Sequence, residues 1–341
     1  MKTLPLLIIG CGGVGRHLLQ HIISCRSLHA LQGISLRVIG VCDSSSLIVP
    51  SELTTGQLDD VLLSELCRVK SKGRPLWSIN QPDFVVHSGT ELKERIMNVS
   101  ALLGKSKGLV LVDCTASSET VEMLSRAVHL GCCVALANKK PLTSTMEDYN
   151  CLLSVPRHLR FESTVGAGLP IIASITRMIN SGDSVYRLIG SLSGTLGYVM
   201  SEVEEGKPLS AVVAAAKNLG FTEPDPRDDL SGMDVARKAL ILARLLGMKI
   251  NMDAINIESL YPKEMGSEFM SVEEFLRSGL VSLDKDVCER VKHASANGNV
   301  LRYVCVIEPP RCEVGLKEVP MNSPLGRLRG SNNIVSNKFQ N

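Results

Sequence analysis

The segment from Glu223 to Lys238 holds the residue types best suited to chemistry. Five carboxylates lie between Glu223 and Asp234, in a loop rich in proline and glycine that leads into a helical pattern. Asp234 and Lys238 are four residues apart, so on a helix they share one face. One interpretation of this segment is a solvated turn followed by an ordinary surface ion pair, without a catalytic role. The helix also carries apolar residues that indicate partial burial, and a lysine held among carboxylates in a cleft is protonated and positioned as a general acid must be (Val235, Leu242, Leu245, Leu246).

A glycine-rich turn near the N-terminus is a second candidate site. Residues 10–15 have the spacing G-x-G-x-x-G and lie between an apolar run and a helical pattern. In this setting the glycines permit a tight turn, a close approach to a pyrophosphate and close packing of helix on strand. The helix N-terminus adds N–H donors. We therefore expect a dinucleotide to bind here, unless the glycines serve packing alone (Gly10, Gly12, Gly13, Val14, Gly15).

Asp43 ends the second expected strand and bears on the choice of dinucleotide. Its carboxylate is placed to accept hydrogen bonds from an adenosine ribose, which would favour NAD. A turn or helix-capping aspartate is the equal alternative. The three serines that follow tolerate a 2′-phosphate, so the sequence leaves NAD and NADP both open (Ser44, Ser45, Ser46).

The elements that must position these residues differ between the two halves of the chain. In the first half, apolar runs at 6–9, 38–42, 109–112 and 132–137 alternate with helical patterns at 14–30 and 119–130. This alternation predicts an α/β architecture with a parallel sheet buried on both faces. In the second half we expect helices from Pro170, at 211–219 and at 235–246, and strands at 185–192, 300–307 and 311–319. The expected domains are 1–160 and 161–330, followed by a short tail at 331–341.

Composition excludes several classes of protein. The 341 residues are 44% hydrophobic and only 4% aromatic, with a formal net charge of +2, so neither a nucleic-acid nor a membrane-surface partner is expected. No apolar run reaches the roughly 18 residues that a bilayer requires, and no targeting signal is apparent. The eleven cysteines form no C-x-x-C pair, which predicts reduced thiols in the cytoplasm. The seven histidines form no ligand cluster, so no zinc or iron site is expected.

Four further segments, together with the glycine turn, resemble homoserine dehydrogenase, in particular the monofunctional fungal and plant type. They are Val112–Ser118, Ala137–Leu142, Glu162–Pro170 and the highly specific Gly220–Lys238. The resemblance implies a Rossmann-type doubly wound parallel sheet that binds NAD or NADP, and a second α+β domain for substrate binding and dimerisation. It implies interconversion of L-homoserine and L-aspartate 4-semialdehyde in threonine, methionine and isoleucine biosynthesis, by a homodimer.

The resemblance also assigns roles to individual residues. Lys238 matches the proton donor to the carbonyl oxygen, and Glu223 and Asp234 match carboxylates that hold the substrate. Further matches are the auxiliary Asp229, the substrate-facing turn at Thr195, the nicotinamide neighbours Thr115 and Lys139, and a backbone position near the cofactor at Gly220. For Lys139 the alternative is a solvent-exposed lysine at a strand end.

The segment from Glu162 to Leu169 resembles the family's loop for a monovalent cation, sodium. The implied ligands are main-chain oxygens, which hard cations accept, and the glycines let a loop fold around an ion (Glu162, Val165, Ala167, Leu169). The alternative is a hinge turn before the helix that begins at Pro170.

The sequence departs from the family pattern near its end. The family's chain returns to the nucleotide domain through a glycine-rich segment, whereas here residues 330–333 match only the approach to that return. We expect weaker cofactor binding and lower stability than in a full-length relative. A truncated, weakly active or silent isoform that binds and dimerises is therefore the alternative function. A different two-domain dehydrogenase is disfavoured by the segment Gly220–Lys238.

Overall fold

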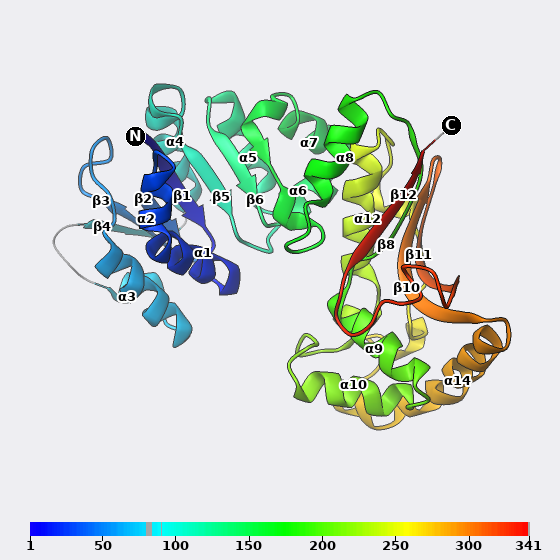
Figure 1. The fold of residues 1–341 in the computed structure, drawn as a ribbon. Helices are drawn as coiled ribbons and strands as arrows, with labels where there is room; N and C mark the ends of the chain where they lie inside the picture. Colours follow the sequence, from blue (N-terminus) through cyan, green and yellow to red (C-terminus); the bar gives the residue numbers. More distant parts are fainter. Residues whose placement is uncertain (80–83, 90, 340–341) are drawn as a thin grey trace. The chain divides into compact units, whose positions relative to one another are not determined.

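The computed structural model describes residues 1–79, 84–89 and 91–339, and it divides into two compact units (Figure 1). Unit 1 comprises Met1–Thr164 and unit 2 comprises Val165–Asn341. Each unit has its own sheet and its own covering helices. The two units are described separately below.

Unit 1 contains a seven-stranded sheet in the order β4-β3-β2-β1-β5-β6-β7. Strands β2, β1, β5, β6 and β7 are mutually parallel, and β3 and β4 extend the sheet in antiparallel fashion. The order reverses at β1, which has β2 on one side and β5 on the other. The strands are β1 (Lys2–Ile9), β2 (Ile34–Cys42), β3 (Ser46–Pro50), β4 (Phe84–Ser88), β5 (Val110–Asp113), β6 (Cys133–Leu136) and β7 (Leu159–Arg160).

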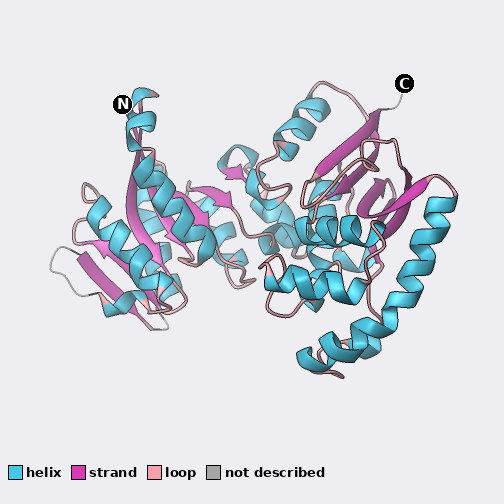
Figure 2. Cartoon of the chain, turned by 60° about the horizontal axis from the view of Figure 1, so that its bottom comes forward, coloured by secondary structure: helices cyan, strands magenta, loops and turns pink. Residues whose placement is uncertain are grey.

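Helices cover both faces of this sheet, as Figure 2 shows. Helices α1 and α3 pack on the face that Leu6 and Ile8 line. Leu7 points to the opposite face, beside Val49, and α4 lies on that side. The helices are α1 (Gly13–Ser24), α2 (Arg26–Leu31), α3 (Asp60–Ser71), α4 (Leu92–Lys107), α5 (Val121–His129), α6 (Lys140–Thr143) and α7 (Met146–Leu152), with 3₁₀ turns at Leu76–Ser78, Pro156–His158 and Glu162–Thr164.

Our prediction of one helix over 14–30 was wrong, because the chain turns at Cys25. There φ is −99° and ψ is 11°, and α2 begins at Arg26. The Arg26 side chain, which donates to the Leu36 carbonyl at 2.6 Å and to the Asp60 carboxylate at 2.7 Å, holds α2 against β2. The second helix is therefore tied to β2 and α3 by a contact that the local sequence pattern does not contain.

Unit 2 is built on a five-stranded sheet in the order β12-β8-β10-β11-β9. All pairings are antiparallel except that of β9 with β11. Side chains alternate between its faces, so Leu188 and Ile307 are fully buried on one side while Ile189 and Val306 are half-buried on the other. The strands are β8 (Val185–Ser191), β9 (Asn256–Ile257), β10 (Asn299–Glu308), β11 (Arg311–Pro320) and β12 (Ile334–Phe339).

Helix α12 packs against β10 and β11, and its apolar face is buried there. Helices α9, α10 and α14 gather at one end of the sheet (Figure 1). The helices are α8 (Ile171–Asn180), α9 (Gly194–Glu204), α10 (Leu209–Asn218), α11 (Arg227–Leu230), α12 (Met233–Leu245), α13 (Val272–Glu274) and α14 (Leu280–Ala296), with 3₁₀ turns at Met252–Ala254 and Lys263–Met265 and a π turn at Phe275–Gly279.

The segment that we expected to be a short tail instead contributes an edge strand. Strand β12 pairs with β8 from Ile334 opposite Ser191 to Phe339 opposite Val185. Its backbone groups are thereby hydrogen-bonded in the sheet, which a free tail would leave to water. Residues 340 and 341 of the expected tail lie outside the described residues.

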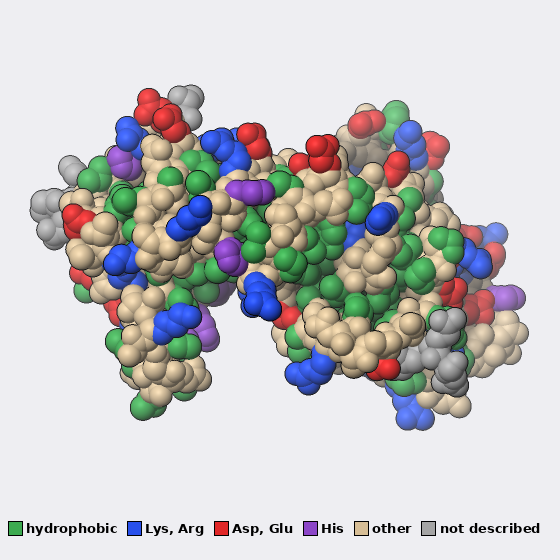
Figure 3. Space-filling model, turned by 90° about the horizontal axis from the view of Figure 1, so that it is seen from above, with side chains coloured by type: hydrophobic (Ala, Val, Ile, Leu, Met, Phe, Trp, Pro, Cys, Tyr) green, Lys and Arg blue, Asp and Glu red, His purple; other side chains and the backbone are tan. Residues whose placement is uncertain are grey.

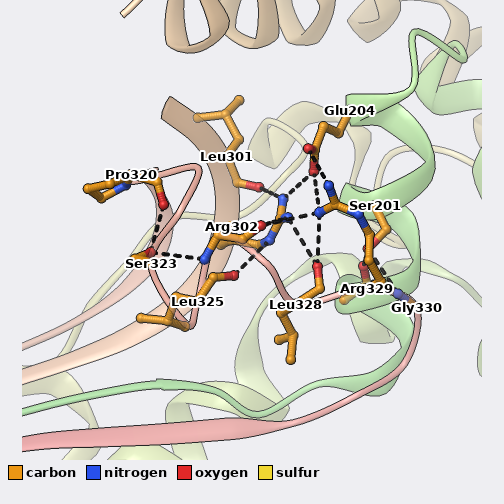
Figure 4. A network of polar contacts seen from close by, with 12 residues as sticks. Ser201, Glu204, Leu301, Arg302, Pro320, Ser323, Leu325, Leu328, Arg329 and Gly330 are labelled. Atoms are coloured by element: carbon orange, nitrogen blue, oxygen red, sulfur yellow. Dashed lines mark hydrogen bonds and ion pairs between the residues drawn. The ribbon is translucent and has the colours of Figure 1, made fainter. Parts of the chain in front are cut away.

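A buried arginine fixes the loop that leads into β12 (Figure 4). Arg302 of β10 is only 1% exposed, and its guanidinium contacts the carboxylate of Glu204 at 2.8 Å. It also donates to carbonyls of the loop, among them Gly326 at 2.7 Å and Leu328 at 3.1 Å. Arg329 reaches the same carboxylate at 3.1 Å. A buried charge requires such pairing, so α9, β10 and the loop are held as one piece.

Charged side chains of both signs lie on the surface. On the visible face in Figure 3, acidic and basic side chains are both scattered. Within the described part of the chain, no helix has the length and apolar character needed to cross a membrane. All eleven cysteines are free, and Cys288 is the exposed one.

Candidate active site

The glycine turn has the geometry of an anion-binding site. Gly10 has φ +95°, a conformation that side chains rarely adopt, and a Cβ on it would lie 2.8 Å from the Thr115 methyl group. A Cβ on Gly15 would lie 2.0 Å from the Gly10 carbonyl oxygen, so helix and turn are in direct contact. Gly12 and Gly13, by contrast, have nothing within 4 Å of such a Cβ. Among the described residues no side chain caps α1, so its first N–H groups can bind a phosphate.

A buried aspartate organises the ends of the neighbouring strands. Asp113, the last residue of β5, is fully buried and accepts hydrogen bonds from the Thr115 amide and hydroxyl at 2.9 and 2.7 Å. Thr120 donates to its other oxygen at 2.7 Å. Asn138, which follows β6, donates to both Asp113 and Thr115, at 3.0 and 3.1 Å. Thr115 is therefore held rigidly beside Gly10.

Lys139 lies at the same edge of the sheet as Thr115. It follows β6 and immediately precedes α6, and its carbonyl accepts hydrogen bonds from Leu142 and Thr143. Its side chain is half-buried rather than fully exposed. Strands β5 and β6 end together, with Asp113 opposite Leu136. In sheets of this kind ligands bind at the carboxyl ends of strands where the order reverses. Thr115 follows β5, beside the reversal at β1, and Lys139 follows the next strand.

Asp43 stabilises a turn. Of the two roles expected for it, ribose binding and turn formation, the structure shows the second. One oxygen accepts from the amides and hydroxyls of Ser45 and Ser46, at 2.8–3.2 Å. The other accepts from Lys70 at 3.0 Å and from the Leu76 amide at 3.1 Å. Burial opposes the charge, but these hydrogen bonds outweigh it and lower the pKa of Asp43 to about 2. The carboxylate is thus already saturated and offers little to a ribose.

In unit 2, Lys238 is held at a defined position on α12. Its ammonium donates to the carbonyl of Leu192 at 2.5 Å and contacts the Asp234 carboxylate at 2.7 Å. The Lys238 side chain is 14% exposed, whereas that of Asp234 is 47% exposed. An ammonium has three N–H bonds, so among the described residues one proton has no partner. Such a proton is available to an oxygen atom of a bound molecule.

The acidic loop adds further carboxylates near this pair. Asp229 accepts a hydrogen bond from the Glu223 amide at 2.8 Å. Burial raises the pKa of Asp229, and the charge of Asp234 adds to the effect, against the hydrogen bond from the Glu223 amide. Thr195, at the start of α9, donates its hydroxyl to the Phe221 carbonyl at 2.6 Å. Glu223 is exposed, so its carboxylate faces solvent. Lys238, Asp234, Asp229, Glu223 and Thr195 thus belong to one polar region of unit 2.

One of the five loop carboxylates has a structural role that the sequence did not reveal. Asp225 forms a two-pronged ion pair with Arg227, at 2.7 Å for the shorter contact. Arg227 is 4% exposed, donates to the Met265 and Met270 carbonyls, and lies 5.3 Å from the centre of the Phe275 ring. This pair stabilises the base of the loop.

Gly220 lies in unit 2, at the turn that ends α10, and has φ +74°. A Cβ there would have nothing within 4 Å, so no close protein packing requires this glycine. Its left-handed backbone conformation is the reason for glycine at this turn.

The expected cation loop has an unusual backbone. Gly166 and Ala167 have φ of 82° and 53°, and Ala167 is the non-glycine residue with positive φ among those described. The Gly166 carbonyl accepts from the Leu169 amide at 3.0 Å, and the Leu169 carbonyl accepts from the Ile171 amide at 2.9 Å. Within the described residues, no three His, Cys, Asp or Glu side chains are grouped to hold a metal ion.

The fold and these two groups of residues define an α/β protein with a Rossmann-type nucleotide unit and a second unit that carries a lysine–carboxylate cluster. The family model for homoserine dehydrogenase matches residues 170–341. Homoserine dehydrogenase of Saccharomyces cerevisiae is 30% identical over 347 residues, which covers 99% of this chain and 89% of that protein. The chain belongs to the homoserine dehydrogenase family.

Other relatives are longer than this chain. The bifunctional aspartokinase/homoserine dehydrogenase of Haemophilus influenzae is 33% identical over 98% of the chain, and a chloroplastic counterpart from Zea mays is 35% identical. The chain spans 39% and 35% of the length of these two relatives. The match therefore concerns one part of those proteins.

Solved structures share the fold. A Candida auris protein of unknown function superposes with a TM-score of 0.83 at 29% identity, covering 100% of this chain and 90% of that one. A hyperthermophilic archaeal homoserine dehydrogenase in complex with NADPH gives a TM-score of 0.70 at 23% identity, with 99% and 89% covered.

Proposed function

We propose that the chain catalyses the NAD(P)-dependent interconversion of L-homoserine and L-aspartate 4-semialdehyde, a step of threonine, methionine and isoleucine biosynthesis. The observation that carries the proposal is the position of Lys238, whose ammonium is held by a carboxylate and a carbonyl with one N–H left over. Membership of the homoserine dehydrogenase family supports the same activity.

Lys238 acts in this proposal as the general acid in reduction and the base in oxidation. The Leu192 carbonyl and Asp234 orient the ammonium, so the proton can be delivered to the carbonyl oxygen of the aldehyde. The negative charges that attract the α-ammonium group of the amino-acid substrate come from Glu223, Asp229 and Asp234. Thr195 holds the start of α9 against the loop and so positions these carboxylates.

The nicotinamide cofactor, when bound, supplies or accepts the hydride. Gly10, Gly12, Gly13, Val14 and Gly15 would hold its pyrophosphate at the N-terminus of α1, since the open space at Gly12 and Gly13 fits such a group. Thr115 and Lys139 would lie near its nicotinamide end, and Gly220 would offer a backbone contact. NADPH is the ligand in one structure with this fold.

Two finer features belong to the same proposal. Main-chain oxygens of Glu162, Val165, Ala167 and Leu169 would hold a monovalent cation such as sodium, a role that suits the positive φ at Ala167. The protein would work in the cytoplasm, because its eleven free cysteines suit a reducing compartment.

We further propose a homodimer formed through unit 2. The sheet face opposite α12 carries half-buried apolar side chains, Ile189 and Val306, above a hollow of about 500 Å³. Oppositely charged side chains at its rim form ion pairs, including Arg187 with Glu308 at 2.7 Å. Sedimentation analysis checks the prediction, and substitution of Val306 by Lys should yield monomers.

A nicotinamide absorbance assay tests the activity. With aspartate 4-semialdehyde and NADPH or NADH, the wild type should turn over, and Lys238→Ala should lose about 100-fold or more in kcat while keeping its fold by circular dichroism. Lys249→Ala is the matched control, because Lys249 is an exposed lysine just beyond α12. Equal activity of the two variants, or an inactive wild type that still folds, would contradict the proposal.

A further inference from the structure

A cavity of about 570 Å³ lies in unit 2, and none of the candidate catalytic residues lines it. It is formed where the turn between α9 and α10 meets α14 and the start of β10. Its volume falls in the range of small-molecule sites, roughly 300–1,000 Å³. Its interior is made mainly of apolar side chains from all four elements (Met200, Val203, Leu209, Val287, Val291, Val300, Leu301).

Lysines outnumber acids in the lining of this cavity, with Lys207, Lys285 and Lys292 against Glu204 and Asp284. The Glu204 carboxylate is bound by Arg302 and Arg329, and that of Asp284 accepts from the Ser210 amide and hydroxyl at 2.8 and 2.6 Å. Two arginines thus offset the charge of Glu204, whereas Asp284 keeps its charge. Two further lysines of the lining are paired with acids outside it, Lys207 with Glu202 and Glu205, and Lys285 with Glu289 at 3.9 Å. Lys292 lines the cavity as well, is exposed, and has no ion pair within the described chain.

The start of α10 is already capped by a carboxylate, because Asp284 accepts from the Ser210 amide in its first turn at 2.8 Å. Pairing with an anion in the cavity therefore falls to the exposed Lys292. A molecule with an apolar body and one anionic end would satisfy both parts of the cavity: the body would cover the valine and leucine side chains, and the anion would reach Lys292.

We propose that this cavity is a regulatory binding site for a small apolar carboxylate, whose charged end pairs with Lys292. The cavity lies at the closed end of the α9–α10 pair. At the other end of the pair Thr195 donates to the Phe221 carbonyl at 2.6 Å, and the rings of Tyr198 and Phe221 are 5.0 Å apart. An occupant that braces the closed end of the two helices therefore stabilises the loop that begins at Phe221.

Cys288 provides a built-in reporter of binding, because it lines the cavity and its thiol is exposed. Octanoate, used below its micelle-forming concentration, should slow alkylation of Cys288 by the neutral reagent iodoacetamide at least fivefold, as measured by peptide mass spectrometry. Octanol, which has the same chain without the charge, should need at least a tenfold higher concentration for half-maximal protection.

Charge reversal tests the role of the lysine. Lys292→Glu should raise the octanoate concentration needed for half-maximal protection at least tenfold, which corresponds to about 1.4 kcal/mol of binding free energy. Lys249→Glu is the matched control, since it reverses an exposed lysine outside the cavity and should bind as the wild type does. Each variant is compared with and without octanoate, so altered intrinsic reactivity of Cys288 cancels.

Hydrogen exchange tests the coupling without relying on enzymatic activity. Octanoate should slow exchange of the peptide that contains Phe221 to Leu230 at least threefold in the wild type and leave Lys292→Glu unchanged. Three results would overturn the proposal: no protection of Cys288, equal protection by octanol or in Lys292→Glu, and protection that rises with protein concentration alone, which would mean that a second copy covers the cavity. Protection without slower exchange would overturn the regulatory role.

Discussion

A Cβ atom on Gly232 would lie 1.8 Å from the hydroxyl oxygen of Tyr303. Gly232 has φ +74° and directly precedes α12, the helix that carries Asp234 and Lys238. The Tyr303 hydroxyl is itself fixed, because it donates to the Glu258 carbonyl at 2.6 Å. The close contact between the turn at Gly232 and Tyr303 of β10 therefore fixes the start of α12, the helix that carries the lysine–carboxylate pair.

Gly232→Ala should reduce the free energy of unfolding by roughly 2–4 kcal/mol, the sum of left-handed strain and overpacking. Gly247→Ala is the control, because Gly247 has φ +88° but nothing within 4 Å of a Cβ, so it should lose only about 1–2 kcal/mol. Urea unfolding measures both. Tyr303→Phe should recover part of the loss in Gly232→Ala, and equal losses for the two glycine variants would disprove the steric argument.

The glycines of the nucleotide turn should separate binding from stability. Gly12→Ala places its methyl group in open space, at φ −81°, so the melting temperature should hardly change while NADPH affinity falls about tenfold or more. In Gly15→Ala the new Cβ would lie 2.0 Å from the Gly10 carbonyl oxygen, so both the melting temperature and the NADPH affinity should fall. Thermal unfolding and cofactor titration decide the matter. An unchanged NADPH affinity in Gly12→Ala would contradict the assignment of the phosphate site to this turn.

Asp43→Asn should cost about 2 kcal/mol of stability at neutral pH, because the pKa of the carboxyl falls from 3.8 to about 2 on folding. Because the pKa of Asp43 is lower in the folded than in the unfolded chain, its stabilising contribution is fully present above the unfolded pKa. The difference between wild type and variant should therefore be constant above pH 4 and shrink as the pH falls towards about 2. Urea midpoints across this range provide the measurement, and a difference that grows on acidification would refute it.

The raised pKa of Asp229 should appear in substrate binding. Under the proposed function its charge attracts the α-ammonium group, and burial makes that charge disappear at a higher pH than for an ordinary aspartate. The KM for homoserine should therefore rise on acidification sooner than the ordinary aspartate pKa predicts. Asp229→Asn should raise KM about tenfold and abolish this rise, whereas Asp286→Asn, on the exposed side of α14, should behave as the wild type.

The strand–turn–helix order around the glycine turn and most strands of both sheets followed from the apolar periodicity of the sequence. The pair Asp234 and Lys238 was also predictable, since their spacing on one helix is local information. The structure confirms that they contact each other, at 2.7 Å.

The contacts that the sequence could not reveal join residues far apart in the chain. Asn138 reaches Asp113 only because β5 and β6 end side by side, and Asp43 is saturated only because Lys70 and Leu76 return to it. An aspartate at a strand end and an Asn-Lys-Lys run were the available signals for the first network. Strand β12 escaped prediction because its Ser, Asn and Lys have low strand propensity, and pairing with β8 overrides that preference.

The position of β8 has a consequence for synthesis of the protein. Both of its neighbours come much later in the chain, since β10 begins at Asn299 and β12 at Ile334. On the ribosome the nucleotide unit can close its sheet early, whereas β8 must wait with two unpaired edges. The newborn chain is thus most vulnerable to misassembly in the interval before β12 emerges.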